Sequence, residues 1–130
     1  MVEARMTATS PEDVDRLFGE RVNAGDLEGV VALYEADATL VTQDAGTLVG
    51  RAAIREYFQG MIAMKVVIDM GTYRVLPAGE GLAVVHHDWT ATVTAPDGTS
   101  FPMSGKATEV VRRQADGSWL FALDDPDMRA

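Results

Sequence analysis

The stretch from Leu82 to Val93 alternates between apolar and polar side chains, and this pattern constrains the fold more than any other part of the sequence. Side chains of a strand point alternately to opposite faces of a sheet, so the alternation predicts one long strand with two unlike faces. The apolar face carries Ala83, Val85, His87, Trp89, Ala91 and Val93, and the polar face carries His86, Asp88, Thr90, Thr92 and Thr94. The apolar face therefore contains a single imidazole.

Length and composition indicate one globular domain over residues 1–130. The chain has 47% hydrophobic and 24% charged residues, and a chain of this size buries roughly two-thirds of the surface that it exposes when unfolded. No run approaches the roughly 18 apolar residues of a membrane helix. The net charge of -9 disfavours phosphate backbones and anionic lipids. We therefore expect no membrane and no nucleic-acid partner.

The amino end and the cysteine content bear on the compartment and on the chemistry. Residues 1–7 lack the basic stretch and apolar run of a secretory signal, so we expect a cytoplasmic location. The chain contains no cysteine. This excludes a disulfide framework, a thiolate metal site and a thiol nucleophile.

Three helices are predicted in the first half of the chain. The first begins at Ser10, whose hydroxyl is suited to cap it, and ends at Gly25, a residue type common at left-handed helix ends. Asp26 caps a second, shorter helix, and a third spans residues 51–61. The apolar residues at helical spacing are Leu27, Val30, Val31 and Tyr34 in the second helix and Ile54, Tyr57, Phe58 and Met61 in the third.

Strands and turns make up most of the remaining chain. They are predicted at residues 38–42, 47–49, 64–76, 82–93, 101–113 and 119–124. The segment 64–76 is long for one strand, and Gly71 near its middle predicts a bend or bulge. Helices followed by antiparallel hairpins predict an α+β domain in which a cone-shaped, curved antiparallel sheet wraps around three N-terminal helices. A cone of this kind is suited to hold a small ligand.

Four short strings recur in one known superfamily. They are Gly25-Asp26-Leu27-Glu28, Leu33-Tyr34-Glu35-Ala36-Asp37-Ala38-Thr39, Val49-Gly50-Arg51-Ala52-Ala53-Ile54, and Gly117-Ser118-Trp119 leading to Asp124. In order and spacing the chain resembles the nuclear transport factor 2-like superfamily, and within it the SnoaL-like and ketosteroid-isomerase-like groups. The resemblance implies a cone with an internal pocket and, as in many members, a homodimer formed through the sheet.

The resemblance leaves two functions open, because this fold carries both enzymes and binding modules. One is a pocket protein for a small hydrophobic ligand, with acid/base activity of the isomerase, cyclase or dehydratase type on a polyketide-like or terpenoid metabolite. The other is a non-catalytic dimeric binding or assembly module. The exposed polar face of the strand from Leu82 to Val93 is what such a module would use.

The resemblance also argues against isomerisation of the steroid type. It places the base of the steroid isomerases on Thr42, their tyrosine on Phe18 and their protonated acid on Glu109. An ordinary threonine hydroxyl does not abstract a proton at neutral pH, and phenylalanine cannot donate a hydrogen bond. Two of the three positions therefore lack the required group.

His87, Glu109 and Asp124 are the candidate catalytic residues. His87 is either an acid or base of the pocket or a neutral core histidine, since histidine exchanges protons near neutral pH. Glu109 interrupts an apolar strand face, where a buried carboxylate needs a donor such as His87 unless that face is exposed at this point. The resemblance puts Asp124 on the pocket side together with Ala122. The alternative is a strand-end acid before the next turn.

The predicted ligand contacts are Tyr34, Thr42, Tyr57, Phe58 and Trp89. Aromatic residues are also common in cores, and Thr42 is equally compatible with a turn. His86 and His87 are adjacent on one strand and face opposite ways, so they cannot both bind one metal ion. We therefore predict no metal and no cofactor.

Overall fold

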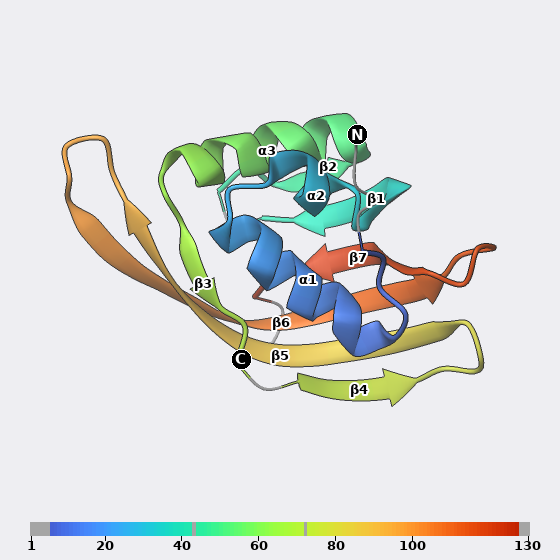
Figure 1. Cartoon of the computed structure of the whole chain (residues 1–130). Helices are drawn as coiled ribbons and strands as arrows, with labels where there is room; N and C mark the ends of the chain where they lie inside the picture. The colour runs from blue at the N-terminus through green and yellow to red at the C-terminus, as the bar shows by residue number, and fades with distance from the viewer. Residues whose placement is uncertain (1–5, 43, 72, 128–130) are drawn as a thin grey trace.

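Three helices cover the concave face of one curved sheet in the computed structural model, which describes residues 6–42, 44–71 and 73–127 (Figure 1). The helices are α1 (Pro11–Asn23), α2 (Leu27–Val31) and α3 (Arg51–Ala63), and the strands are β1 (Tyr34–Val41), β2 (Thr47–Val49), β3 (Val67–Asp69), β4 (Tyr73–Pro77), β5 (Leu82–Thr94), β6 (Ser100–Arg113) and β7 (Trp119–Asp125). Within these residues, no helix has the length and apolarity needed to cross a membrane.

The predicted α+β arrangement of three helices on a curved sheet is confirmed. The sheet has the strand order β2-β1-β7-β6-β5-β3, with β4 also paired to β5, and it is open at its ends. One detail differs from the expected antiparallel sheet, because β1 and β7 are parallel. Parallel neighbours need a long crossover, and the chain between β1 and β7 supplies one that includes α3. Turn sequences indicate pairing only between consecutive strands, so they could not predict the pairing of β1 with β7.

The strand from Leu82 onward forms as its alternation predicts. β5 pairs with β6 along its whole length, from Leu82 opposite Arg112 to Thr94 opposite Ser100. Its apolar face is buried under the helices, with Trp89 only half-buried, and Asp88 on the opposite face is exposed. These two long strands form the floor below α1 (Figure 1).

The second helix is shorter than its apolar spacing predicts. α2 ends at Val31, and Tyr34 is the first residue of β1. The backbone N–H of Phe121 donates to the carbonyl of Leu33, and Tyr34 lies opposite Phe121 in the sheet. Pairing with β7 therefore places Tyr34 in the sheet. The placement of Tyr34 in a helix was wrong. The spacing of nearby apolar residues cannot show that Tyr34 pairs with Phe121, which lies 87 positions further along the chain.

The bend expected at Gly71 is confirmed. The segment 64–76 divides into β3 and β4, which both pair with β5, and Gly71 lies between them with a φ of 64°. That region of φ favours glycine. In addition, a Cβ at this position would overlap the backbone carbonyl of Asp88. The bend brings the carbonyl of Met70 to the imidazole of His87.

Candidate functional site

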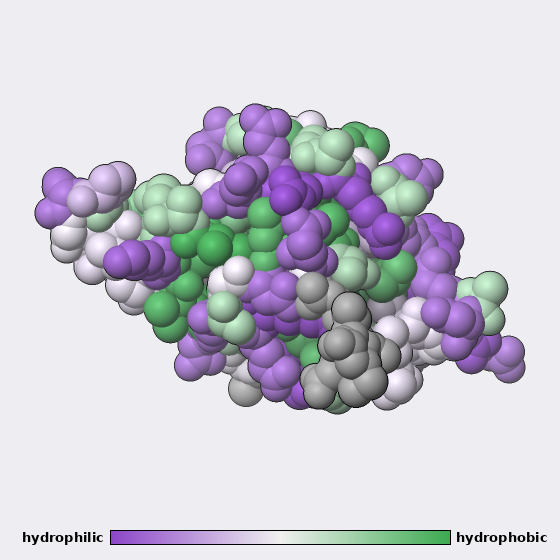
Figure 2. Space-filling model, turned by 45° about the horizontal axis from the view of Figure 1, so that its top comes forward, coloured by the Kyte–Doolittle hydropathy of each residue, from purple (hydrophilic) through white to green (hydrophobic). Residues whose placement is uncertain are grey.

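A cavity of about 340 Å³ lies between α1, α3 and the concave face of the sheet. Its wall is mainly apolar and contains four methionines, Met61, Met64, Met70 and Met103. Figure 2 shows hydrophobic surface gathered between the helices and the protruding end of the sheet, with hydrophilic surface beside it. Methionine side chains adapt to ligands of different shape, so this wall is suited to an apolar molecule.

The structure gathers the predicted site residues at this cavity, with one exception. The cavity wall includes the three candidate catalytic residues and four predicted ligand contacts: His87, Glu109, Asp124, Thr42, Tyr57, Phe58 and Trp89. Tyr34 is fully buried and lies outside the cavity wall. The Thr42 hydroxyl donates to the carbonyl of Gly46 and accepts from the N–H of Ala45, so it also belongs to the turn.

His87 and Glu109 form a short buried hydrogen bond at the cavity wall. His87 Nε2 lies 2.6 Å from Glu109 Oε2, and both residues are 3% exposed. His87 Nδ1 lies 3.0 Å from the carbonyl oxygen of Met70, and since a carbonyl only accepts, Nδ1 carries a proton. One proton therefore lies between Nε2 and Oε2. The pair is either imidazolium with carboxylate or imidazole with carboxylic acid.

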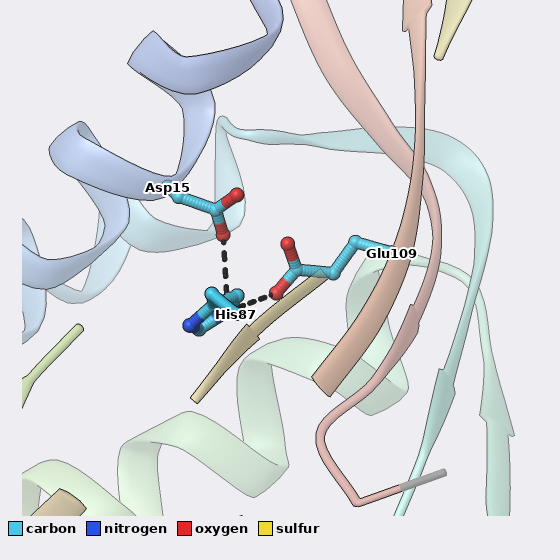
Figure 3. Close-up of side chains that lie close together, drawn as sticks. All are labelled: Asp15, His87 and Glu109. Atoms are coloured by element: carbon cyan, nitrogen blue, oxygen red, sulfur yellow. Dashed lines mark hydrogen bonds and ion pairs between the residues drawn. The ribbon is translucent and has the colours of Figure 1, made fainter. Parts of the chain in front are cut away.

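Asp15 completes this group and was missed by the sequence analysis. It projects from α1, is fully buried, and places Oδ1 at 3.4 Å from His87 Nε2 (Figure 3). Burial, followed by the negative charge of Glu109, raises its pKa well above the ordinary range for a carboxyl. Its spacing was an available signal, since Asp15 precedes Phe18 by three residues and Val22 by seven, which puts it on their helix face.

Among the residues that the structure describes, Asp15, His87 and Glu109 form a group that could hold a metal ion, because one ligand atom from each lies within 4.8 Å of the others. Ligands about 2.1 Å from a tetrahedral metal are roughly 3.4 Å apart. The 2.6 Å separation of His87 Nε2 and Glu109 Oε2 is much shorter and suits a shared proton. The absence of a metal stays a prediction.

Asp124 reaches the cavity through a bulge in β7. The register slips between Val110, opposite Leu123, and Val111, opposite Phe121, so Ala122 is the extra residue. Asp124 therefore lies on the face of Phe121. That Asp124 shares a face with Ala122 stays a prediction, because strict alternation fails across a bulge.

Tyr34 lies outside the cavity wall and forms a hydrogen bond to Asp124. Its hydroxyl donates to Asp124 Oδ2 at 2.6 Å. Burial raises the pKa of Asp124 to about 6, while the hydrogen bond from Tyr34 acts in the opposite direction. Burial, followed by the charge of Asp124, raises the pKa of Tyr34 well above its ordinary range. Tyr34 thus stays protonated and remains a donor.

The chain after β7 closes one side of the cavity. The indole Nε1 of Trp89 donates to the carbonyl of Pro126 at 2.7 Å, and Pro126 and Asp127 belong to the cavity wall. This segment crosses β6 at Gly105, where a Cβ would overlap the carbonyl of Pro126 and lie 2.7 Å from Trp89 Nε1. Glycine at position 105 is therefore required for this close approach.

Comparison with solved structures shows the same fold at low identity. A ketosteroid isomerase-like protein from Erwinia carotovora atroseptica SCRI1043 is 23% identical with a TM-score of 0.78, and the match covers 88% of this chain and 89% of that one. A candidate scytalone dehydratase from Novosphingobium aromaticivorans DSM 12444 is 17% identical with a TM-score of 0.79, covering 88% and 78%. A nuclear transport factor 2-like superfamily protein from Salmonella enterica serovar Typhimurium LT2 is 14% identical with a TM-score of 0.76, covering 93% and 96%.

A search of curated proteins found no match. The family model described as a SnoaL-like domain matches residues 14–121, a range that begins within α1 and ends within β7. Both the family model and the shared fold agree with the resemblance of the four sequence strings. The chain therefore belongs to the SnoaL-like domain family, and it shares its fold with a ketosteroid isomerase-like protein and a nuclear transport factor 2-like superfamily protein.

Proposed function

We propose that the protein is an acid/base enzyme of the isomerase, cyclase or dehydratase type, acting on a small, largely apolar molecule such as a polyketide-like or terpenoid metabolite. The observation that carries this proposal is the 2.6 Å contact between His87 Nε2 and Glu109 Oε2 on the wall of an apolar cavity. A proton held between two such groups exchanges readily with a bound molecule.

Three titratable residues line one row across the sheet. His87 on β5 contacts Glu109 on β6, and Glu109 lies directly opposite Asp124 on β7. Side chains of directly paired residues project on the same face with Cβ atoms about 5 Å apart. A substrate that lies along this row would meet a base at one end and an acid at the other.

The proton transfers follow from this row. The Glu109 carboxylate accepts a proton from a carbon of the substrate while the shared proton stays on His87 Nε2, and protonated Asp124 donates a proton to a carbonyl or a departing hydroxyl oxygen. With a pKa of about 6, Asp124 exists in both forms near neutral pH. The enzyme is restored when the proton passes back from the pair to Asp124, directly or through product and water.

Asp15 and Tyr34 are positioning residues in this scheme. Neither belongs to the cavity wall, and both are fully buried. Asp15 faces His87 Nε2 from the helix side, and Tyr34 holds Asp124 from the sheet. The names of two structural neighbours, a ketosteroid isomerase-like protein and a candidate scytalone dehydratase, support proton-transfer chemistry for this fold.

Proton abstraction is testable without the natural substrate. Tetralone, a compact cyclic ketone, exchanges its α-hydrogens for deuterium in D₂O, and NMR measures the rate. We expect wild-type protein to accelerate exchange, and His87→Gln to lower the acceleration about 100-fold or more. His86→Gln, a neighbouring histidine on the opposite face of β5 and outside the cavity wall, is the matched control and should retain the rate. Equal rates for wild-type and His87→Gln proteins would contradict the proposal, once circular dichroism shows that both are folded.

The homodimer is also a proposal. The polar face of β5 leaves Asp88, Thr90 and Thr92 on the outside of the sheet, where a second copy would cover them. Sedimentation at micromolar concentration should give a species of twice the 14.0 kDa chain mass. A species of 14.0 kDa alone would contradict the dimer. The cytoplasmic location and the absence of a cofactor stay predictions.

A further inference from the structure

The charged side chains on the cavity wall are all acidic, apart from the titratable His87. Glu109 and Asp124 are buried inside, while Asp44 and Asp127 are exposed. Among the wall residues that the structure describes, none is lysine or arginine. The wall therefore presents negative charge to whatever enters.

Several described arginines are engaged elsewhere. Arg16, Arg55 and Arg112 form ion pairs with acidic side chains that lie outside the cavity wall. Inside the cavity, the hydrogen bond from Tyr34 occupies Oδ2 of Asp124, and Asp124 remains part of the wall. A carboxylate in an apolar cavity gains most from a ligand group that carries positive charge, because little water is present to screen it.

Aromatic rings lie on the same wall. Tyr57, Phe58 and Trp89 border the cavity, and the faces of such rings attract cations. Its volume of about 340 Å³ matches a compact molecule, near the lower end of ordinary ligand pockets of roughly 300 to 1,000 Å³. Carboxylates, aromatic rings and small volume thus point to one ligand class.

We infer that the cavity selects its ligand by charge, taking a compact apolar molecule with a protonated amine and rejecting carboxylates and phosphates. This inference rests on the proposed function, since it names the substrate class of the same cavity. The apolar body contacts the methionines and rings, and the amine faces the carboxylates. An anionic group of the same size meets repulsion from each acid on the wall that is ionised.

Three probes with one naphthalene body test the charge preference: naphthylmethylamine, naphthylmethanol and naphthoic acid. Isothermal titration calorimetry of the full chain at neutral pH and low ionic strength measures each affinity. We expect the amine to bind about tenfold or more tighter than the acid, with the alcohol between them. Added salt should narrow the difference, because it screens the exposed acids more than the buried ones.

Two variants test whether the exposed acids on the cavity wall cause the preference for the amine. The double variant Asp44→Asn with Asp127→Asn removes the exposed charges and should reduce the preference for the amine by about threefold or more. The control is Glu80→Gln, which removes one charge at an exposed position outside the cavity wall and should keep the preference.

Each outcome decides between the two proposals. If the acid binds as tightly as the amine, the charge selection is wrong and the binding cavity stands. If none of the three probes binds, both the charge selection and the cavity of the proposed function are wrong. If the amine is preferred while His87→Gln leaves tetralone exchange unchanged, the acid/base chemistry alone is wrong.

Discussion

The hydrogen bond from Tyr34 to Asp124 is predicted to control the charge of Asp124, and Tyr34→Phe tests this directly. The substitution removes one oxygen that lies 2.6 Å from Asp124 Oδ2 and keeps the ring packed against Phe121, with centroids 4.9 Å apart. No other hydrogen bond of the Tyr34 hydroxyl is present among the described residues. The variant therefore isolates a single interaction.

The expected magnitude follows from the two protonation states of Asp124. A hydrogen bond to a charged group contributes about 2 kcal/mol to stability, and one to a neutral group about 1 kcal/mol. The difference of about 1 kcal/mol corresponds to a rise of about 1 in pKa. Tyr34→Phe should therefore raise the pKa of Asp124 from about 6 to roughly 7.

The sign of the pH dependence follows by linkage. Since the variant binds the proton of Asp124 more tightly when folded, it loses more stability above pH 7 than below pH 6. The free energy of unfolding should fall by about 1 kcal/mol at pH 5 and by about 2 kcal/mol at pH 8, relative to wild-type protein.

Two independent measurements test this reasoning. Carbon-13 NMR of the Asp124 carboxyl gives the pKa in both proteins, and urea unfolding gives the stability at each pH. Tyr57→Phe is the control, because Tyr57 lies on the cavity wall without a hydrogen bond to Asp124. An unchanged carboxyl titration, or an equal loss of stability at both pH values, would refute the argument.

Two further predictions concern stability. Asp124→Asn should flatten the pH dependence of the free energy of unfolding. The folded pKa of Asp124, about 6, exceeds the ordinary 3.8, so the wild-type carboxyl stabilises the fold at low pH, and this contribution of roughly 2 to 3 kcal/mol is lost as the pH rises through about 6. Urea unfolding of both proteins at each pH measures the difference. Gly105→Ala should displace Pro126, lower the free energy of unfolding by about 1 to 3 kcal/mol and alter the fluorescence of Trp89. The control is Gly60→Ala on α3, where a Cβ meets open space, and it should raise the free energy of unfolding by about 0.5 to 1 kcal/mol.

Regular stretches of the chain determined their own structure. The alternation in β5 places His87 under the helices, and the same period in β6 places Glu109 beside it. Both strands pair without a register shift over their common length, so side chains alternate between the two faces of the sheet throughout. The caps at Ser10 and Asp26 likewise act within one helical turn, and both side chains accept the expected backbone N–H.

Sites that depend on two distant segments could not be predicted in this way. Asp15 carries a helical signal, but only the docking of α1 on the sheet brings it to His87. Tyr34 enters the sheet because β7 pairs with it, against its helical spacing. Asp124 turns inward because of one bulge residue, and no local pattern marks that residue.

The sequence by itself determined most element types and the curved α+β fold, and it put His87 and Glu109 on apolar strand faces, because periodicity and caps act between near neighbours. Only the tertiary structure decided the parallel pairing of β1 with β7, the approach of Asp15 and the inward turn of Asp124. These features depend on contacts between segments far apart in the chain. Their energies come from packing and desolvation, which exist only once the chain has folded.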